Sequence, residues 1–354
     1  FVEMLEAGYT AVAEFHYLHH AAGGEPYANR AEMSERMIGA ARRAGIGLTL
    51  LLTLYEFADF GGAPVSAAQQ RFVTPVRKLV DLHGALERRY FGAADLRFGF
   101  APHSLRAVSP ESFAALQSAA RDRYPRPPMH VHAAEQQKEV EDCVAWRGAR
   151  PVAWLLEHAD RELPWTFVHA THVDASEVEA MAQAGIVAAL CPTTEANLGD
   201  GIFPAEEFVR GGGRYGVGSD SGVTIDPFGE LRWLEYSQRW RLQRRSVVAS
   251  AAAPSLGESL FRAATSAGPA ALGRQIGAIE PGYRADFIVT DRAEPAFVGV
   301  EENGFLDALI FNAKKPVRDV YVAGERIVAE GRHRKRDEVA GRYRETMTRL
   351  RKRM

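Results

Sequence analysis

Two histidines and a glutamate lie close together in the segment MHVHAAEQQKE, residues 129–139. His130 and His132 are two residues apart, so in a strand they point to the same face. Either could bind a metal ion, and Glu135 could then move protons between a metal-bound water and a leaving group. A histidine pair in a strand is more often structural than metal-binding, so this segment alone does not decide between the two.

Two later segments carry further ionisable groups. FVHATH ends a second apolar run at His169, with His172 just beyond it, and GVGSDSG ends a third run at Asp220. An aspartate at a strand end often only caps a loop. Packing alone does not readily explain three strands that each deliver an ionisable group at the same end. Together with His132 and Glu135, these groups favour a metal-dependent hydrolase.

The elements that position these groups follow a strand–helix alternation. Short runs of small and β-branched residues alternate with amphipathic stretches, which predicts repeated βα units and a parallel sheet. The predicted strands are 10–15, 47–54, 96–101, 129–133, 166–170, 186–191 and 215–218. The predicted helices lie near 32–44, 73–90, 110–123, 135–146, 175–184, 228–245 and 257–272.

The predicted fold class is α/β, a (β/α)8 TIM-type barrel. In such a barrel the reactive groups stand at the carboxyl ends of the strands, where the ionisable groups fall here. A doubly wound open sheet is the alternative, but the glycine pairs at 23–24 and 61–62 do not form its phosphate-binding turn. The chain opens at Phe1 in a segment typical of a helix running into a strand, so we expect residues 1–276 to be a barrel lacking its first strand.

The last part of the chain changes character. From about Gly277, short alternating segments punctuated by Gly and Pro predict a small β-domain portion over 277–333. Residues 334–354 carry nine basic and three acidic side chains and are predicted to form a basic helix or tail. A solvated helix is favoured over a nucleic-acid surface, because no series of aromatic residues is interleaved with the charge.

Composition narrows the class of protein. The 354 residues are 46% hydrophobic and 25% charged with a net charge of −2, as in ordinary globular proteins without a polyanionic partner. Only Cys143 and Cys191 are cysteines, which argues against a disulfide framework and for a reducing compartment. The first segment, residues 1–9, lacks the basic start and apolar centre of a secretory signal, and no run approaches eighteen apolar residues. We expect a cytoplasmic protein with a small-molecule substrate, no nucleic-acid or membrane partner and, as an open alternative, a homodimer.

The residues above resemble those of the amidohydrolase superfamily. The order His132-x-x-Glu135, His169 and Asp220, closed by IGAIEPGYRADFIVTD, is similar to its deaminase branch over nearly the whole chain. More specific strings resemble the formimidoylglutamate deiminases of histidine degradation: EFHYLHH, PHSLRAV, HVHAAEQQKEVEDC, TEANLGDGIFP and ELRWLEYSQR. The resemblance implies zinc-dependent deimination of N-formimidoyl-L-glutamate, a dicarboxylate, to N-formyl-L-glutamate and ammonia.

The resemblance also implies roles for single residues. His132 would bind one Zn²⁺ per site, or another divalent metal, and Asp220 would bind the metal and take a proton from its water. His169 would polarise that water or the developing oxyanion, and Glu135 would carry protons to the substrate nitrogen. Zinc lowers the pKa of its water to about 7, so that hydroxide can attack the formimino carbon.

Substrate contacts are implied for Tyr17, His103 and Arg106. Arg106 follows a predicted strand end, and a guanidinium fork matches a substrate carboxylate bidentately where lysine would not. For Tyr17, a place in the barrel wall is nearly as good an interpretation. His16, His19 and His20 are interpreted as loop structure or as support around the site rather than as metal ligands; the role of His130 is left open.

One part of the superfamily pattern is missing. The superfamily binds zinc also through a His-x-His motif at the end of its first strand, and His130 and His132 occupy the fifth-strand position instead. We therefore interpret the chain as a fragment of an active enzyme and expect it to bind zinc weakly and to be inactive alone. Two alternatives stay open: a deaminase of the same superfamily acting on a purine, pyrimidine or triazine ring, and a binding protein that keeps the barrel without a metal.

Overall fold

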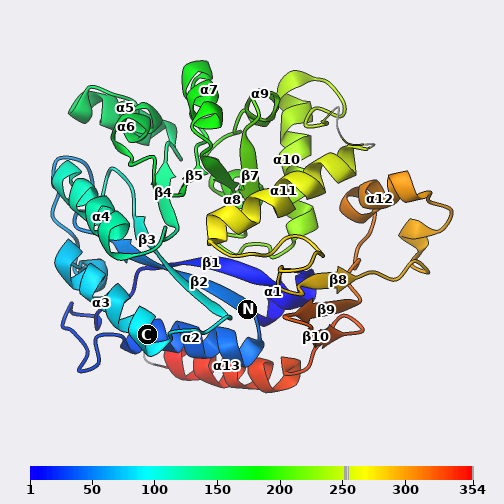
Figure 1. Cartoon of the computed structure of the whole chain (residues 1–354), viewed down its shortest axis with the longest axis horizontal. Coiled ribbons are helices and arrows are strands. Elements are labelled where there is room, and N and C mark those ends of the chain that lie inside the picture. Colours follow the sequence, from blue (N-terminus) through cyan, green and yellow to red (C-terminus); the bar gives the residue numbers. More distant parts are fainter. Residues whose placement is uncertain (251–252, 254, 353–354) are drawn as a thin grey trace.

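The barrel sheet dominates the computed structural model, which describes residues 1–250, 253 and 255–352. Its seven strands lie in chain order and each pairs in parallel with the next. They are β1 (Ala11–His16), β2 (Gly47–Leu54), β3 (Leu96–Pro102), β4 (Met129–Ala133), β5 (Trp165–His169), β6 (Val187–Leu190) and β7 (Arg214–Val217). The predicted α/β fold of the TIM-barrel type is confirmed (Figure 1).

Helices follow most of the strands (Figure 1). They are α1 (Val2–Ala7), α2 (Glu32–Ala44), α3 (Val76–Arg89), α4 (Pro110–Arg123), α5 (Gln137–Arg147), α6 (Pro151–His158), α7 (Ala175–Gln183), α8 (Pro192–Leu198), α9 (Ala205–Arg210), α10 (Pro227–Leu242), α11 (Leu256–Leu272), α12 (Phe305–Phe311) and α13 (Arg336–Arg351), with 3₁₀ turns at Gln70–Phe72, Pro295–Phe297 and Glu302–Gly304. The seven helices expected from the sequence are all present. Four short ones, α6, α8, α9 and α12, were not predicted, because six to eight residues hardly show a helical period.

The burial of β2 on both faces explains why its sequence shows no alternation of apolar and polar residues. All eight of its residues, GLTLLLTL, are buried. A parallel strand covered on one side by helices and on the other by the barrel interior has no solvent face, so it does not alternate apolar and polar residues.

The carboxyl end of α11 closes the amino-terminal end of the barrel. Thr49 Oγ1 donates to the carbonyl of Leu272 at 2.8 Å, and His130 Nε2 donates to the carbonyl of Ala271 at 2.7 Å. Both donors lie near the amino ends of their strands. Thr49 and His130 therefore each satisfy one orphan carbonyl at the helix end. Burial lowers the pKa of His130 to about 4, which keeps the ring neutral.

In the part of the chain that the structure describes, no backbone ladder joins β7 to β1. A cavity of about 390 Å³ lies between these two edges, with Ala11, Val217 and Phe228 among its lining residues.

A second, antiparallel sheet follows the barrel. Its strands are β8 (Phe287–Val289), β9 (Asp319–Val322), β10 (Glu325–Ala329) and β11 (Arg332–His333), in the order β11-β10-β9-β8. The segment 277–333, expected to be a small β-domain portion, also contains α12, which packs on α10 and α11. α1 lies against this sheet, since His333 donates its backbone N–H to Glu6 Oε1 at 2.9 Å.

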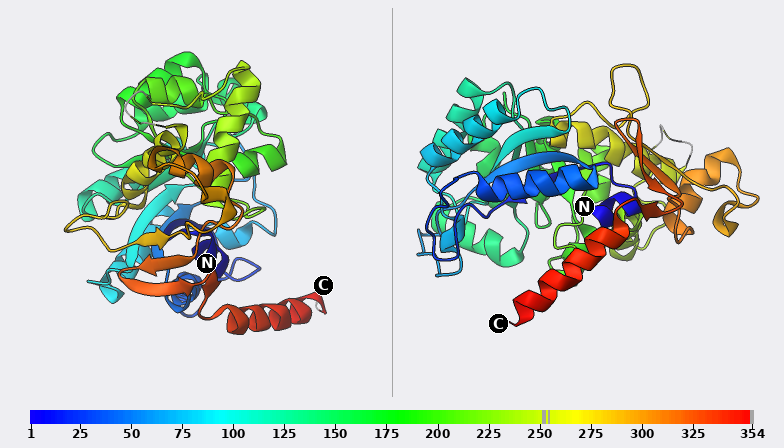
Figure 2. Two further views of the ribbon diagram at one scale, coloured as in Figure 1. Left: turned by 90° about the vertical axis from the view of Figure 1, so that its right-hand side faces the viewer. Right: turned by 90° about the horizontal axis from the view of Figure 1, so that it is seen from below.

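Helix α13 ends the described chain, and Figure 2 shows it projecting from the rest of the molecule in both views. None of its residues is buried. Among the helices of the described residues, none has the length and apolar character needed to cross a membrane.

Candidate active site

The carboxyl ends of β4 to β7 bring the predicted groups to one rim of the sheet, as parallel strands require. His132 lies next to last in β4, His169 ends β5, and Asp220 follows β7. The rings of His132 and His169 are stacked with centroids 5.7 Å apart. His169 and Asp220 have positive φ angles of 66° and 37°, a backbone conformation that non-glycine residues adopt mainly where surrounding structure enforces it, often at functional sites.

His132 is held in one tautomer. Its Nδ1 donates to the backbone carbonyl of His103 at 2.8 Å, so Nε2 carries the lone pair. Burial, reinforced by the neighbouring rings of His103 and His169, holds the pKa of His132 well below its usual range. A neutral imidazole with a bare nitrogen is the form that binds metal ions. Phe15 contacts both His132 and His130, so the two histidines share the inner face of the sheet, as the spacing predicts.

Glu135 lies between a cation and an imidazole. Its Oε2 is 3.5 Å from Arg106 Nη2 and its Oε1 is 3.7 Å from His169 Nε2. Burial raises the pKa of Glu135, while the charges of His169 and Arg106 oppose the rise. Glu139 fixes the backbone here by accepting the N–H groups of Ala134 at 3.2 Å and Glu135 at 3.0 Å. A carboxyl group so placed can carry a proton across the rim.

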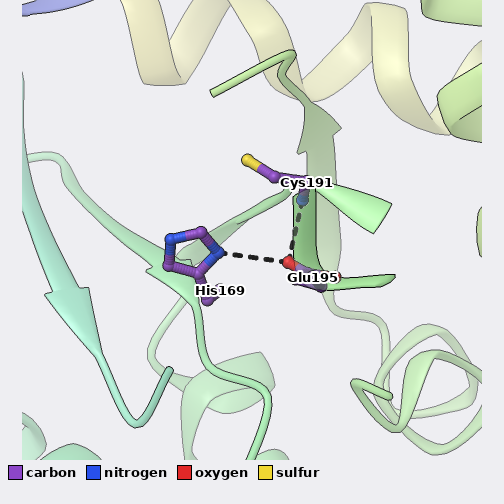
Figure 3. Close-up of side chains that lie close together, drawn as sticks. All are labelled: His169, Cys191 and Glu195. Atoms are coloured by element: carbon purple, nitrogen blue, oxygen red, sulfur yellow. Dashed lines mark hydrogen bonds and ion pairs between the residues drawn. The ribbon is translucent and has the colours of Figure 1, made fainter. Parts of the chain in front are cut away.

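His169 is the most enclosed of these groups, with 1% of its surface exposed. Its Nδ1 donates to Glu195 Oε1 at 3.2 Å, and the same oxygen accepts the backbone N–H of Cys191 at 2.9 Å (Figure 3). Burial alone would lower the pKa of His169, but the hydrogen bond to Glu195 and the charge of Glu135 outweigh burial and raise it.

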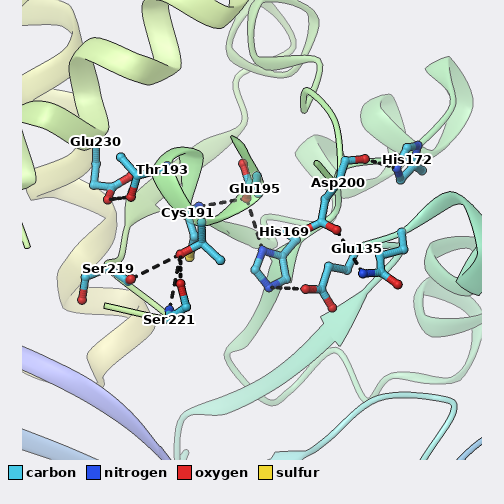
Figure 4. A network of polar contacts seen from close by, with 12 residues as sticks. Glu135, His169, His172, Cys191, Thr193, Glu195, Asp200, Ser219, Ser221 and Glu230 are labelled. Atoms are coloured by element: carbon cyan, nitrogen blue, oxygen red, sulfur yellow. Dashed lines mark hydrogen bonds and ion pairs between the residues drawn. The ribbon is translucent and has the colours of Figure 1, made fainter. Parts of the chain in front are cut away.

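Asp220 stands at the exposed side of the rim. The residues on either side of it are held by Thr194, whose hydroxyl contacts the Ser219 carbonyl at 3.3 Å and the Ser221 hydroxyl at 3.0 Å (Figure 4). The negative charge of Asp220 contributes to the raised pKa of His169, after the larger effects of Glu195 and Glu135. The structure thus places His169 near both His132 and Glu135, with Asp220 close enough for its charge to act on His169.

The three residues expected to contact substrate form one wall. The Tyr17 and His103 rings meet edge to face with centroids 5.5 Å apart. His103 Nδ1 contacts Ser104 Oγ at 2.8 Å, and burial lowers the pKa of His103 to about 3. The Arg106 side chain is 28% exposed, while its Nε is buried without a hydrogen-bond partner in the described chain. The exposed part of the guanidinium can be reached by a ligand carboxylate, although the sequence did not indicate its ion pair with Glu135.

His16, His19 and His20 support the segment that follows β1. His19 Nε2 donates to the Thr53 carbonyl at 2.9 Å, and His20 Nε2 contacts the Val73 carbonyl at 3.0 Å. The His16 ring packs edge to face on His19. These contacts fix the segment after β1 against β2.

The donor groups at the rim suit a divalent metal. The imidazole of His132 and the carboxylate of Asp220 are types of ligand that zinc accepts, and the tautomer of His132 leaves Nε2 available. Ligand atoms of His169, Cys191 and Glu195 also lie within 4.8 Å of one another, and all three residues are buried. The sequence assigned neither Cys191 nor Glu195 a role at the site.

Comparison with known proteins is consistent with this geometry. A model of the amidohydrolase family matches residues 1–327. The formimidoylglutamate deiminase of Pseudomonas aeruginosa is 48% identical over 334 residues, 94% of this chain and 73% of that protein. An amidohydrolase from Brucella melitensis has a similar structure, with a TM-score of 0.92, 44% identity, and coverage of 99% of this chain and 76% of that one. A zinc-bound adenosine deaminase from Xanthomonas campestris shares the fold at 23% identity, with a TM-score of 0.78 over 99% of this chain and 73% of that one.

Proposed function

Because this chain belongs to the amidohydrolase family, we propose that its rim catalyses the zinc-dependent deimination of N-formimidoyl-L-glutamate in histidine degradation. The products are N-formyl-L-glutamate and ammonia. The observation that carries the proposal is the position of Glu135 between Arg106 and His169, because it sets a proton carrier beside a group that can bind a carboxylate. The cytoplasmic location and the homodimer stay predictions from the sequence.

His132 and Asp220 would hold the divalent ion, which, when bound, lowers the pKa of a coordinated water to about 7. The carboxylate of Asp220 would accept a proton from the water that adds to the formimino carbon. The N–H of His169 Nε2 donates to charge that develops on the reacting centre, while Glu195 keeps Nδ1 occupied. His132 stays oriented through the His103 carbonyl.

Glu135 completes the proton transfer. Its raised pKa favours the protonated acid, which can donate to the terminal nitrogen of the tetrahedral adduct. Asp220 would return its proton to the same nitrogen while the adduct hydroxyl gives its proton to Glu135. The carbon–nitrogen bond then breaks and ammonia leaves, so the net change is addition of one water and loss of one ammonia. Arg106 binds a carboxylate of the glutamate moiety through its free N–H groups and orients the formimino group toward Glu135.

The direct test is an assay of the zinc-loaded full-length gene product. We expect ammonia release from N-formimidoyl-L-glutamate with matching appearance of N-formyl-L-glutamate, and no turnover of adenosine, guanine or a chlorotriazine. Turnover of a neutral ring with none of the dicarboxylate would replace the proposal by the ring-deaminase alternative. Stoichiometric zinc without turnover of any of these compounds would overturn the substrate assignment, and absence of bound metal would favour a binding protein.

A further inference from the structure

His169 lies between two carboxylates that contact opposite nitrogens of its ring. Glu195 Oε1 is 3.2 Å from Nδ1, and Glu135 Oε1 is 3.7 Å from Nε2 (Figures 3 and 4). An ionised carboxylate can only accept a hydrogen bond, so Nδ1 carries a hydrogen. Nε2 is then the nitrogen on the side of Glu135 and the reacting groups. It is the nitrogen that can gain or lose a proton during the reaction.

Glu195 is buried, with 4% of its surface exposed, although a buried carboxylate is costly unless it is paired. Among the described residues, its ion pair is with His169. The other contact of its carboxylate, from the Cys191 backbone N–H, needs only a neutral acceptor, which a glutamine would supply equally well. The negative charge of Glu195 therefore serves the imidazole ring rather than the backbone.

The two residues before Glu195 fix the first turn of α8. The Thr193 N–H donates to Glu230 at 3.0 Å, which ties the turn to α10. Thr194 contacts Ser219 and Ser221, which flank Asp220 (Figure 4). The turn that holds the His169 ring thus also holds the loop that carries Asp220.

We infer that Glu195 is a positioning residue: its carboxylate holds His169 with Nδ1 protonated and directs Nε2 toward Glu135. The expected effect of Glu195 on kcat rests on the proposed function, whereas its expected effect on the orientation and tautomer of the His169 ring does not.

The test uses Glu195→Gln and Glu195→Ala in the zinc-loaded full-length protein. Losing an outer partner of a catalytic imidazole typically costs about 10- to 100-fold in activity, so we expect kcat to fall by about that factor for both variants. KM should stay within a few-fold of its original value, because Glu195 does not face the Arg106 side of the rim. The ¹⁵N chemical shifts of the His169 ring, identified by their loss in His169→Asn, should show a lost Nδ1–H hydrogen bond in Glu195→Ala. In Glu195→Gln they should show a weakened one, because the amide oxygen accepts the bond without a charge.

Glu235→Gln is the matched control. Glu235 is also a fully buried carboxylate that accepts two backbone N–H groups, from Val247 at 3.0 Å and Val248 at 2.9 Å, but it lies in α10 and contacts Arg239 rather than a histidine. This variant should lose thermal stability and leave both kcat and the His169 shifts unchanged.

The outcomes separate this inference from the proposed function. Unchanged kcat and unchanged ring shifts in Glu195→Gln would overturn the positioning role, as would equal losses of kcat in Glu235→Gln. If the parent protein does not deiminate the substrate, the proposed function fails, while the ring shifts of Glu195→Gln still decide whether Glu195 sets the tautomer. If Glu195→Ala does not fold, the glutamine variant provides the same comparison.

Discussion

The imidazole Nδ1 of His132 donates to the backbone carbonyl of His103, 2.8 Å away on the neighbouring strand end. The end of β3 therefore orients the ring that β4 supplies. Outer contacts of this kind hold metal-binding histidines in one orientation.

We predict that His132→Ala abolishes stoichiometric zinc binding in the full-length protein, measured by elemental analysis after dialysis. His130→Gln is the control, because His130 shares the inner face but bonds to the Ala271 carbonyl at 2.7 Å. The control should keep its zinc and lose about 1–3 kcal/mol of stability, since a buried carbonyl loses a well-placed donor. Equal zinc loss in both variants would contradict the assignment of His132.

Arg106 is predicted to act mainly on substrate binding. Arg106→Ala should raise KM for N-formimidoyl-L-glutamate by roughly 10- to 100-fold, the value of one charge-assisted hydrogen bond to a carboxylate. Arg106→Lys should recover only part of this loss, because an ammonium cannot form the same fork. Arg123→Ala, on the exposed end of α4, serves as the control. An unchanged KM in Arg106→Ala would show that the guanidinium serves Glu135 alone.

Glu139 is predicted to position Glu135 through the backbone. Its two carboxylate oxygens accept the N–H groups of Ala134 and Glu135, so Glu139→Gln replaces one acceptor by a donor. We expect a loss of about 1–3 kcal/mol in the free energy of unfolding and a fall in kcat. Glu177→Gln removes an equivalent pair of bonds, from Ala153 and Asp174, away from the rim. That control should lose stability at unchanged kcat; a similar kcat loss in both would mean that the effect is one of general stability.

Acid should unfold the protein partly through His83. This ring is fully buried in α3, with the Phe100 and Tyr124 rings 4.2 and 4.1 Å away between centroids. Burial, assisted by the charge of Arg97, lowers the pKa of His83 from 6.5 to about 3. Between these two values the unfolded chain binds a proton that the folded chain does not, so stability falls as pH falls by about 1.4 kcal/mol per pH unit.

His83→Phe should reduce this dependence. Denaturant unfolding at pH 8, where both proteins have neutral rings, gives the packing effect of the substitution alone. At pH 5 the variant should have lost about 2 kcal/mol less than the parent relative to pH 8. An identical pH dependence in the two proteins would show that the ring is protonated in the folded state.

The sequence predicted most of the barrel because its elements carry local signals. α4 begins where Ser109 caps the helix and Pro110 takes its first position, and it occupies the predicted residues. The histidine spacing in β4 predicted a shared face, which Phe15 contacts. The predicted roles of the site residues stay predictions until the variants are measured.

What the sequence could not show depends on contacts between distant residues. Glu195 lies in α8, a helix of seven residues, and its partner His169 is 26 residues away. Neither the ion pair of Arg106 with Glu135 nor the bond of His130 to a helix end leaves a pattern along the chain. Such pairs become visible only when the strand ends are placed side by side.

The end of α11 lies across the starts of β2 and β4, and this position also affects how ligands reach the barrel interior. These contacts lie at the amino ends of the strands, on the side of the sheet opposite the rim. Under the proposed function, substrate and product would therefore both pass the rim side, where Arg106 lies. A dicarboxylate product that stays bound near Arg106 would exclude the next substrate molecule, so the enzyme should show competitive inhibition by its own product.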